Sequence, residues 1–190
     1  MKSIVLAASL MAFGTAAFAD AEKYTLDASH SQIVFSYNHL GFSTTYGMFS
    51  GFEGEIMFDE ADPATSSVSV SMPVMSMFTG WEQRDGHFMS GDFFGASEDD
   101  LVTFTSTSIE VTGDTTAKIT GDLSMNDVTK SVVLDAVLNK AGDNPMAGVP
   151  WLGFDATTSV MRSDFGLGAF APAISDEVKI VISLEAQKAG

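Results

Sequence analysis

The chain has 190 residues, no cysteine and a formal net charge of −16, with 25 Asp and Glu against 9 Lys and Arg. The lack of cysteine excludes disulfides, thiol chemistry and thiolate-bound metal. The acidic charge argues against nucleic acid and anionic membrane surfaces as partners, because both would repel the protein. The length suits a single domain with a sizeable core.

The first nineteen residues have the features of a targeting segment. Lys2 precedes an apolar run, and Ala17-Phe18-Ala19 has the small-x-small pattern of a cleavage site. The apolar run is short for a membrane anchor, and polar sequence soon follows it. We therefore expect residues 1–19 to be a signal peptide. Residues 20–190 would then be one exported, periplasmic domain without stable membrane insertion.

Alternation of apolar and polar residues with a period of two dominates the rest of the chain. It predicts a strand over 32–38, with Phe35 and Tyr37 on its apolar face. It also predicts one long strand over 42–58, in which glycines would permit bending. A turn over 59–65 then leads into a further strand over 67–74.

The same pattern returns after residue 100. It predicts strands over 102–111, 117–125, 132–138, 152–160 and 178–186, with a hairpin turn at Gly113-Asp114. About eight antiparallel strands, each with one apolar face, must close on themselves or pack as two sheets. We expect an all-β fold, a closed antiparallel barrel of about eight strands with room for one slender ligand.

The segment before residue 100 interrupts the β pattern with a short helical insertion. Thr79 and Glu82 have the spacing of a capping box, which predicts a helix that ends at about residue 88. Arg84 and Asp85 would lie on the face toward the barrel, flanked by two aromatic side chains. His87 would point elsewhere.

No catalytic constellation is visible in the sequence. It has no Gly-x-Ser-x-Gly nucleophile motif. Its three histidines, His30, His39 and His87, lie in separate segments without the spacing of zinc ligands. We expect a protein that is not an enzyme, with no metal site and no cofactor.

The chain has only two arginines, and each lies close to an aspartate: Arg84 beside Asp85, and Arg162 near Asp164. A half-buried arginine needs a carboxylate partner, because an unpaired buried charge costs several kcal/mol. Two roles are open at this point. The arginines act as structural clamps between loops, or they orient the head of a ligand at the mouth of a cavity.

The chain resembles the YceI-like family over essentially the whole mature sequence. The resemblance is carried, in chain order, by YTLDASHSQIVFSYNHLGFSTTYGMFSGFEGEIMFD, RDGHFMSGDFF, ITGDLSMNDVTKSVVLD, RSDFGLG and ISDEVKI. It implies an exported, eight-stranded, lipocalin-like barrel whose interior holds a long amphiphile, such as a polyisoprenoid, an isoprenoid quinone or a fatty-acid derivative. It also implies a homodimer. The residues at the family's motif positions are His30, His39, Arg84, Asp85, His87, Asp92, Phe93, Phe94, Arg162, Asp164 and Phe165.

A few positions depart from the family pattern. Met89 stands where the family has an arginine, and Asn126-Asp127 replaces a common His-Gly. Phe78 and Trp81 replace residues that are usually polar. The loss of a cation and the gain of apolar bulk favour a neutral head, such as a quinone, amide or phenol, over pyrophosphate.

We therefore expect a periplasmic binding or carrier protein for an isoprenoid-type lipid. The alternatives are a solid-cored β protein that serves as a stress or interaction module, and a small outer-membrane barrel, whose strands alternate in the same way. The candidate lining residues are Phe35, Tyr37, Phe42, Tyr46, Met48, Phe52, Met72, Met75, Met77, Phe78, Trp81, Phe88, Phe93, Leu123 and Phe165. The candidates for the ligand head or the clamp are His30, Arg84, Asp85, His87, Arg162 and Asp164.

Overall fold

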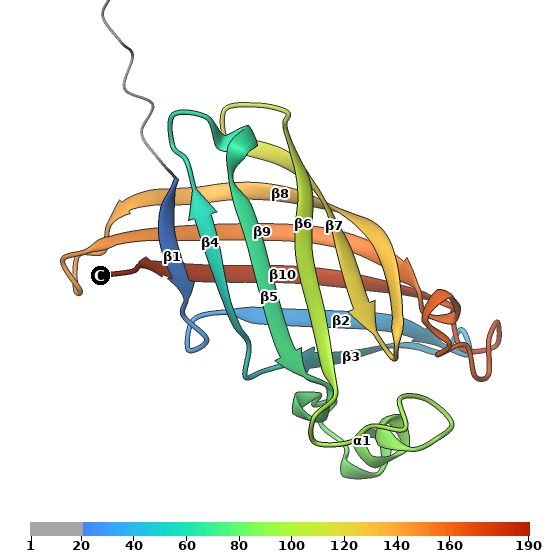
Figure 1. The fold of residues 1–190 in the computed structure, drawn as a ribbon. Coiled ribbons are helices and arrows are strands. Elements are labelled where there is room, and N and C mark those ends of the chain that lie inside the picture. Colours follow the sequence, from blue (N-terminus) through green and yellow to red (C-terminus); the bar gives the residue numbers. More distant parts are fainter. Residues whose placement is uncertain (1–20) are drawn as a thin grey trace, which may run out of the picture.

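The computed structural model describes residues 21–190, so the predicted signal peptide lies outside the described residues. Antiparallel strands make up most of the described chain (Figure 1). They are β1 (Glu22–Leu26), β2 (Gln32–His39), β3 (Ser43–Phe49), β4 (Glu53–Phe58), β5 (Ser67–Pro73), β6 (Leu101–Val111), β7 (Thr116–Met125), β8 (Val128–Asp143), β9 (Pro150–Met161) and β10 (Glu177–Lys188). The helices are α1 (Glu82–Met89) and three short 3-10 helices, η1 (Pro63–Thr65), η2 (Val74–Ser76) and η3 (Arg162–Phe165).

Eight of these strands close a barrel, in the order β1-β4-β5-β6-β7-β8-β9-β10, and β10 pairs back to β1. The closing pairs include Leu26 opposite Ala186 and Tyr24 opposite Lys188. The predicted eight-stranded antiparallel barrel is therefore confirmed. The other two strands, β2 and β3, form a hairpin that pairs through β2 with residues 179–183 of β10.

The alternation of the sequence becomes an inside and an outside of the barrel. Val70, Phe104 and Leu123 are cross-strand neighbours on β5, β6 and β7, and all three are buried in the interior. Their sequence neighbours Ser71 and Thr103 face outward from the same strands. In the view of Figure 1, β4, β5 and β6 cross the direction of β8, β9 and β10, as in a barrel built from two crossed sheets.

The predicted long strand over 42–58 is wrong as a single element. β3 ends at Phe49 and β4 begins at Glu53. Between them Gly51 has a φ of 64°, in the left-handed region that favours glycine. This turn separates β3, which pairs with β2, from β4, which pairs with β1 and β5. The apolar alternation continues through the glycine, so alternation alone could not reveal the break.

Helix α1 confirms the predicted helical insertion, but not the predicted cap. Trp81 occupies the N-cap position, and no side chain caps the first turn. Thr79, the expected cap, lies two residues too early, because Gly80, with a φ of 79°, bends the chain and Trp81 is extended before the helix begins. Its amide instead donates a 2.9 Å hydrogen bond to the carboxylate of Asp85, and its hydroxyl contacts the same carboxylate oxygen.

The end of the barrel next to α1 is filled by side chains. Val74, Met77 and Phe165 are buried there. Phe93 and Phe94, which follow α1, pack against the same core. Within residues 21–190, no helix is long and apolar enough to cross a membrane.

Candidate functional site

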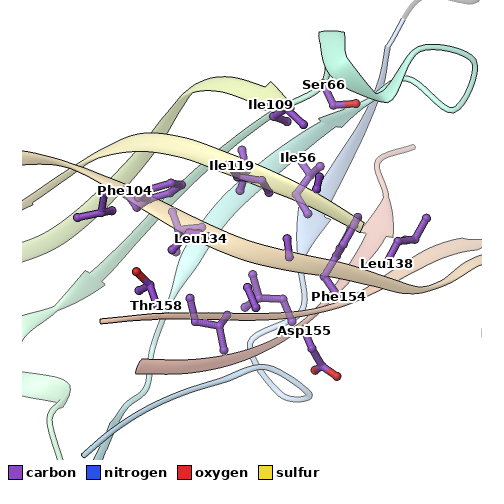
Figure 2. Close-up of a pocket in the computed structure, with 18 of the residues that line it drawn as sticks. Ile56, Ser66, Phe104, Ile109, Ile119, Leu134, Leu138, Phe154, Asp155 and Thr158 are labelled. Atoms are coloured by element: carbon purple, nitrogen blue, oxygen red, sulfur yellow. The ribbon is translucent and has the colours of Figure 1, made fainter. Parts of the chain in front are cut away.

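The interior of the barrel contains a cavity of about 230 Å³ (Figure 2). Apolar side chains from β2 to β10 form most of its wall. They are Ile33, Phe35, Phe49, Ile56, Phe58, Val68, Val70, Met72, Val102, Phe104, Ile109, Val111, Ala117, Ile119, Leu123, Met125, Val132, Leu134, Ala136, Leu138, Phe154, Ala156, Ile180, Ile182 and Leu184. The chain therefore encloses a space suited to hydrocarbon.

A row of alanines helps to keep this space open. Ala117 on β7, Ala136 on β8 and Ala156 on β9 stand side by side in register. The row continues to Val111 on β6 and to Ile182 on β10, and all five residues line the cavity. Because alanine ends at one methyl group, three neighbouring strands contribute little volume at the same level of the barrel.

The cavity opens at the end of the barrel that carries η1 and the β6–β7 turn. Pro63 and Ser66 line it from one loop, and Asp114 and Thr115 line it from the other. Val111 borders the cavity and still keeps 47% of its surface exposed, as expected beside an opening. Polar side chains thus collect around this mouth, whereas the wall below it is apolar.

The opposite end of the cavity is closed. On β6 the lining extends from Val102 to Val111, which corresponds to about 30 Å at roughly 3.3 Å per residue. Beyond Val102 the barrel is filled by the buried side chains of Val74, Met77 and Phe165. The cavity is therefore a deep, blind space with one mouth.

The wall below the mouth presents few polar atoms. Thr158 lines the cavity, and its hydroxyl donates a 2.8 Å hydrogen bond to the carbonyl oxygen of Val133. Asp155 borders the cavity, but its side chain points away from it (Figure 2). The interior can therefore surround an uncharged chain without leaving a charged group of its own unpaired.

Three of the predicted lining residues, Phe35, Met72 and Leu123, do line the cavity. Their part in binding a ligand stays a prediction. The sequence-based selection missed most of the wall, including Ile119, Leu134 and the alanine row. A signal for these residues was present, because they occupy the apolar positions of the predicted strands.

Six other predicted lining residues are buried or half-buried, but away from the cavity: Tyr37, Phe52, Met77, Phe88, Phe93 and Phe165. Three of them form an aromatic contact between α1 and β2. The ring centroids of Tyr37 and Phe88 are 6.1 Å apart, and those of Phe88 and Phe93 are 5.2 Å apart. These rings fix the α1 segment against the barrel and help to close its end.

The remaining six predicted lining residues lie on the outside of the barrel: Phe42, Tyr46, Met48, Met75, Phe78 and Trp81. Phe42 is 90% exposed and Tyr46 is 63% exposed. On β3, Gly47 pairs with the buried Phe35, so Gly47 faces inward and its neighbours Tyr46 and Met48 face outward. Large side chains at the even positions of β3 therefore belong to the surface.

Arg84 and Asp85 hold the loop before α1 together. Arg84 donates from Nε to the Thr79 hydroxyl oxygen and from a terminal nitrogen to the Thr79 carbonyl oxygen, both at 2.8 Å. The guanidinium lies 5.7 Å from the centroid of the Trp81 ring. These contacts are those of a local structural clamp. Arg84 lies at the closed end of the barrel rather than at the mouth.

Arg162 clamps the loop between η3 and β10 through backbone carbonyls. It donates to Ser175 O at 2.9 Å, to Ile174 O at 3.0 Å and to Ala169 O at 2.8 Å, and it also contacts Leu167 O. Burial lowers the pKa of the Arg162 guanidinium from its ordinary value, while nearby Asp176 opposes this shift.

The expected pairing of each arginine with a neighbouring aspartate is wrong. No ion pair within 4.0 Å joins Arg84 or Arg162 to a carboxylate in residues 21–190. Asp164 is exposed. Asp176 is the carboxylate that supports this loop, since it accepts a 2.8 Å hydrogen bond from the Ser163 amide. Carbonyl oxygens satisfy the guanidinium in place of a counter-charge.

The histidines lie away from the cavity. His87 Nε2 is 3.0 Å from a carboxylate oxygen of Asp92, and its ring packs edge-on against Phe93 with centroids 5.1 Å apart. His30 Nδ1 lies 2.6 Å from a carboxylate oxygen of Asp27. That hydrogen bond and the charge of Asp27 raise the pKa of His30.

One group of side chains has the composition of a metal site, although no spacing in the sequence indicates it. Single ligand atoms of Asp27, His30 and Glu185 lie within 4.8 Å of one another. Glu185 is too far along the chain for spacing to reveal it. Glu185 also accepts a 2.9 Å hydrogen bond from the indole nitrogen of Trp151. Protein partners therefore already engage all three side chains.

Comparison with known proteins matches residues 24–186 to the YceI-like domain. The chain belongs to the YceI-like family. A curated YceI protein from Escherichia coli O17:K52:H18 is 39% identical over 178 residues, covering 94% of this chain and 92% of that protein. The family assignment made from the sequence motifs is confirmed.

Solved structures of this family and fold superpose on the chain. The crystal structure of a Campylobacter jejuni YceI protein matches with a TM-score of 0.73 and 29% identity, over 80% of this chain and 90% of that one. A polyisoprenoid binding domain from Saccharophagus degradans matches with a TM-score of 0.68 and 15% identity, over 87% of this chain and 98% of that one. At that identity the second match shows a shared fold.

Proposed function

We propose that this protein binds and carries an isoprenoid-type amphiphile, a polyprenoid or an isoprenoid quinone, inside its barrel. The observation that carries the proposal is the deep, blind cavity with an apolar wall. A hydrocarbon chain in that space would leave water, and each Å² of buried apolar surface contributes about 25 cal/mol. Such a tail can be held tightly without specific polar contacts.

The shape of the cavity supports a slender ligand. A barrel of about eight strands has an interior just wide enough for its own side chains or for one small ligand. The alanine row at Ala117, Ala136 and Ala156 provides width where bulkier residues would fill it. The Saccharophagus degradans neighbour is described as a polyisoprenoid binding domain. The ligand class proposed here rests on the cavity of this chain.

Two structural observations weigh against the alternative functions. A solid-cored interaction module would fill its interior with side chains, whereas this interior holds a cavity of about 230 Å³. An outer-membrane barrel directs its apolar residues outward. Here Val70 and Phe104 face inward, and the neighbouring Ser71 and Thr103 face outward.

The cavity supports a particular orientation for the ligand. Arg84 and Arg162 lie at the closed end and bind protein atoms, so neither is placed to receive a ligand head. The head would lie instead at the mouth, beside Ser66 and Asp114, with the tail directed toward Val102. This orientation reverses the one expected from the sequence.

Binding rather than catalysis is the role that this apolar wall supports. Export to the periplasm and a homodimer also remain predictions. A periplasmic fraction that contains a chain beginning at Asp20 would support the first. Light scattering on the purified mature protein would test the second.

Native mass spectrometry of the mature protein tests the proposed function. After incubation with an isoprenoid alcohol or quinone, we expect one added ligand mass for each chain. The binding should survive mild activation, because the tail is enclosed. A protein that stays empty with both ligands, while a detergent control shows it folded, would contradict the proposal.

A further inference from the structure

We propose that the mouth of the cavity selects ligands by the charge of their heads. It favours an amphiphile with a cationic or neutral, hydrogen-bonding head and disfavours phosphate and pyrophosphate. This inference rests on the proposed function, because it assumes an amphiphile in the cavity with its head at the mouth. It adds the chemical class of that head.

The two loops at the mouth carry acidic charge alone. The loop over 59–66 contains Asp59, Glu60 and Asp62, and the turn over 112–115 contains Asp114. Neither loop contains Lys, Arg or His. Asp114 borders the cavity directly. A head with negative charge would therefore approach carboxylates, and like charges repel most strongly at such short range.

The basic residues on the strands beside the mouth do not offset this charge. Lys118 Nζ lies 2.6 Å from a carboxylate oxygen of Asp135, with which it forms an ion pair. Lys140 pairs in register with Gly153, whose neighbour Phe154 lines the cavity. Because side chains alternate along a strand, Lys140 lies on the outward side of the barrel.

The mouth also provides hydrogen-bonding groups for an uncharged head. The Ser66 hydroxyl oxygen accepts a 3.0 Å hydrogen bond from the Asp59 amide, so its own proton is free to donate. The Asp114 carboxylate accepts no hydrogen bond from residues 21–190 and is exposed. An alcohol, an amide or an amine can therefore form hydrogen bonds here without a counter-ion.

Three ligands with the same apolar tail and different heads show how the charge of the head affects affinity, because the contribution of the tail is the same in each. We would measure displacement of the neutral dye N-phenylnaphthylamine from the mature protein by farnesol, farnesylamine and farnesyl monophosphate. At low ionic strength, the alcohol and the amine should bind about tenfold or more tightly than the monophosphate, and added salt should narrow that gap. Equal or tighter binding of the monophosphate would overturn the inference.

Reversing the charge of acidic residues at the mouth tests whether these residues cause the difference in affinity. The variant Asp62→Lys/Asp114→Lys should raise the affinity for farnesyl monophosphate about fivefold or more relative to farnesol. The matched control Glu98→Lys/Asp99→Lys makes the same change in net charge on exposed residues at the other end of β6. It should leave the ratio unchanged. An equal shift in both variants would show that overall charge, not the mouth, selects the ligand, and would overturn the inference.

These experiments distinguish the inference from the function on which it rests. If farnesol binds but the three heads bind equally, the charge selection fails and the proposed function survives. If none of the three ligands displaces the dye from the folded protein, the proposed function fails, and the charge selection fails with it.

Discussion

The ring of Phe104 lies directly over Gly121 on the neighbouring strand. A β-carbon at residue 121 would stand 2.4 Å from Phe104 Cζ and 2.6 Å from the carbonyl oxygen of Thr105. Real side chains do not approach so closely, so the absence of a β-carbon at Gly121 is what allows the ring to lie in this position. Because Phe104 lines the cavity, this contact sets the width of the cavity at that level.

The variant Gly121→Ala should destabilise the fold and narrow the cavity. The added methyl group must push the Phe104 ring inward or shift the β6 backbone, and such overpacking costs about 1–3 kcal/mol. We expect a fall in Tm of about 2–4 °C for each kcal/mol at this chain length. Gly153→Ala is the matched control on β9, because no atom lies within 4 Å of a β-carbon there. Equal effects of both substitutions would contradict this account of the wall.

Arg162→Ala should lower stability strongly and leave ligand binding by the folded protein unchanged. The substitution removes the donors to Ala169 O, Ile174 O and Ser175 O. Hydrogen bonds from a charged donor contribute about 1.5–3 kcal/mol each, so the total loss should be about 3 kcal/mol or more.

Arg84→Ala offers the comparison for Arg162. Its guanidinium hydrogen-bonds to one residue, Thr79, and lies near the exposed Trp81, so its loss should destabilise the fold less than the loss of Arg162. Urea denaturation and native mass spectrometry together would show both effects. A variant of either arginine that loses ligand at unchanged stability would restore its role at a ligand head.

The contact between His30 and Asp27 should make stability depend on pH. The Asp27 hydrogen bond and its charge raise the pKa of His30 above its ordinary 6.5. Hydrogen bonds from the Ser29 hydroxyl, which has the larger effect, and from His30 lower the pKa of Asp27 below its ordinary 3.8. The contribution of His30 to the free energy of unfolding is complete below the pKa of histidine in the unfolded chain. It is lost as the pH rises through the raised pKa of His30 in the folded protein. The aspartate contribution is complete above its unfolded-state pKa and is lost as the pH falls through the lowered value.

Both contributions are therefore present between about pH 4 and 6.5. The free energy of unfolding of His30→Gln should fall further below that of the unsubstituted protein at pH 5.5 than at pH 8.5. In an Asp27→Asn background, the effect of His30→Gln should lose most of its pH dependence, because only the charge of Glu185 then raises the pKa of His30. If the difference in free energy of unfolding between the two proteins stays constant or grows toward alkaline pH, the contact between His30 and Asp27 does not stabilise the folded state.

Much of the barrel could be predicted because its physical cause is local. On β5 to β10, successive residues mostly alternate between the apolar interior and water, so the apolar and polar pattern of the sequence predicts which residues face inward. The break between β3 and β4 could not be predicted from the alternation. A turn at Gly51 ends the strand there, yet the alternation of apolar and polar residues continues through it. The outward direction of Tyr46 follows from that break and could not be predicted without it.

The location of the mouth could not be predicted from the sequence. Arg84 and Arg162 are the only arginines in the sequence and were therefore candidates for the ligand head. In the structure, both donate hydrogen bonds to nearby backbone carbonyl oxygens. The actual mouth is formed by Ser66 and Asp114, which lie in two ordinary turns. The closure of β1 onto β10 brings the strands into a ring, and the packing of Val74, Met77 and Phe165 closes the other end. That is long-range information, which no local motif contains.

The most direct test of the central claim is to fill the cavity from within. Ala156→Phe places a large ring inside the cavity, at the β9 end of the alanine row, while Thr157→Phe places the same ring on the outward face of the same strand. Uptake of an isoprenoid alcohol or quinone would be measured for both variants by native mass spectrometry, with circular dichroism to confirm folding. We expect Ala156→Phe to lose uptake and Thr157→Phe to retain it. Full uptake by a folded Ala156→Phe protein would show that the ligand binds elsewhere.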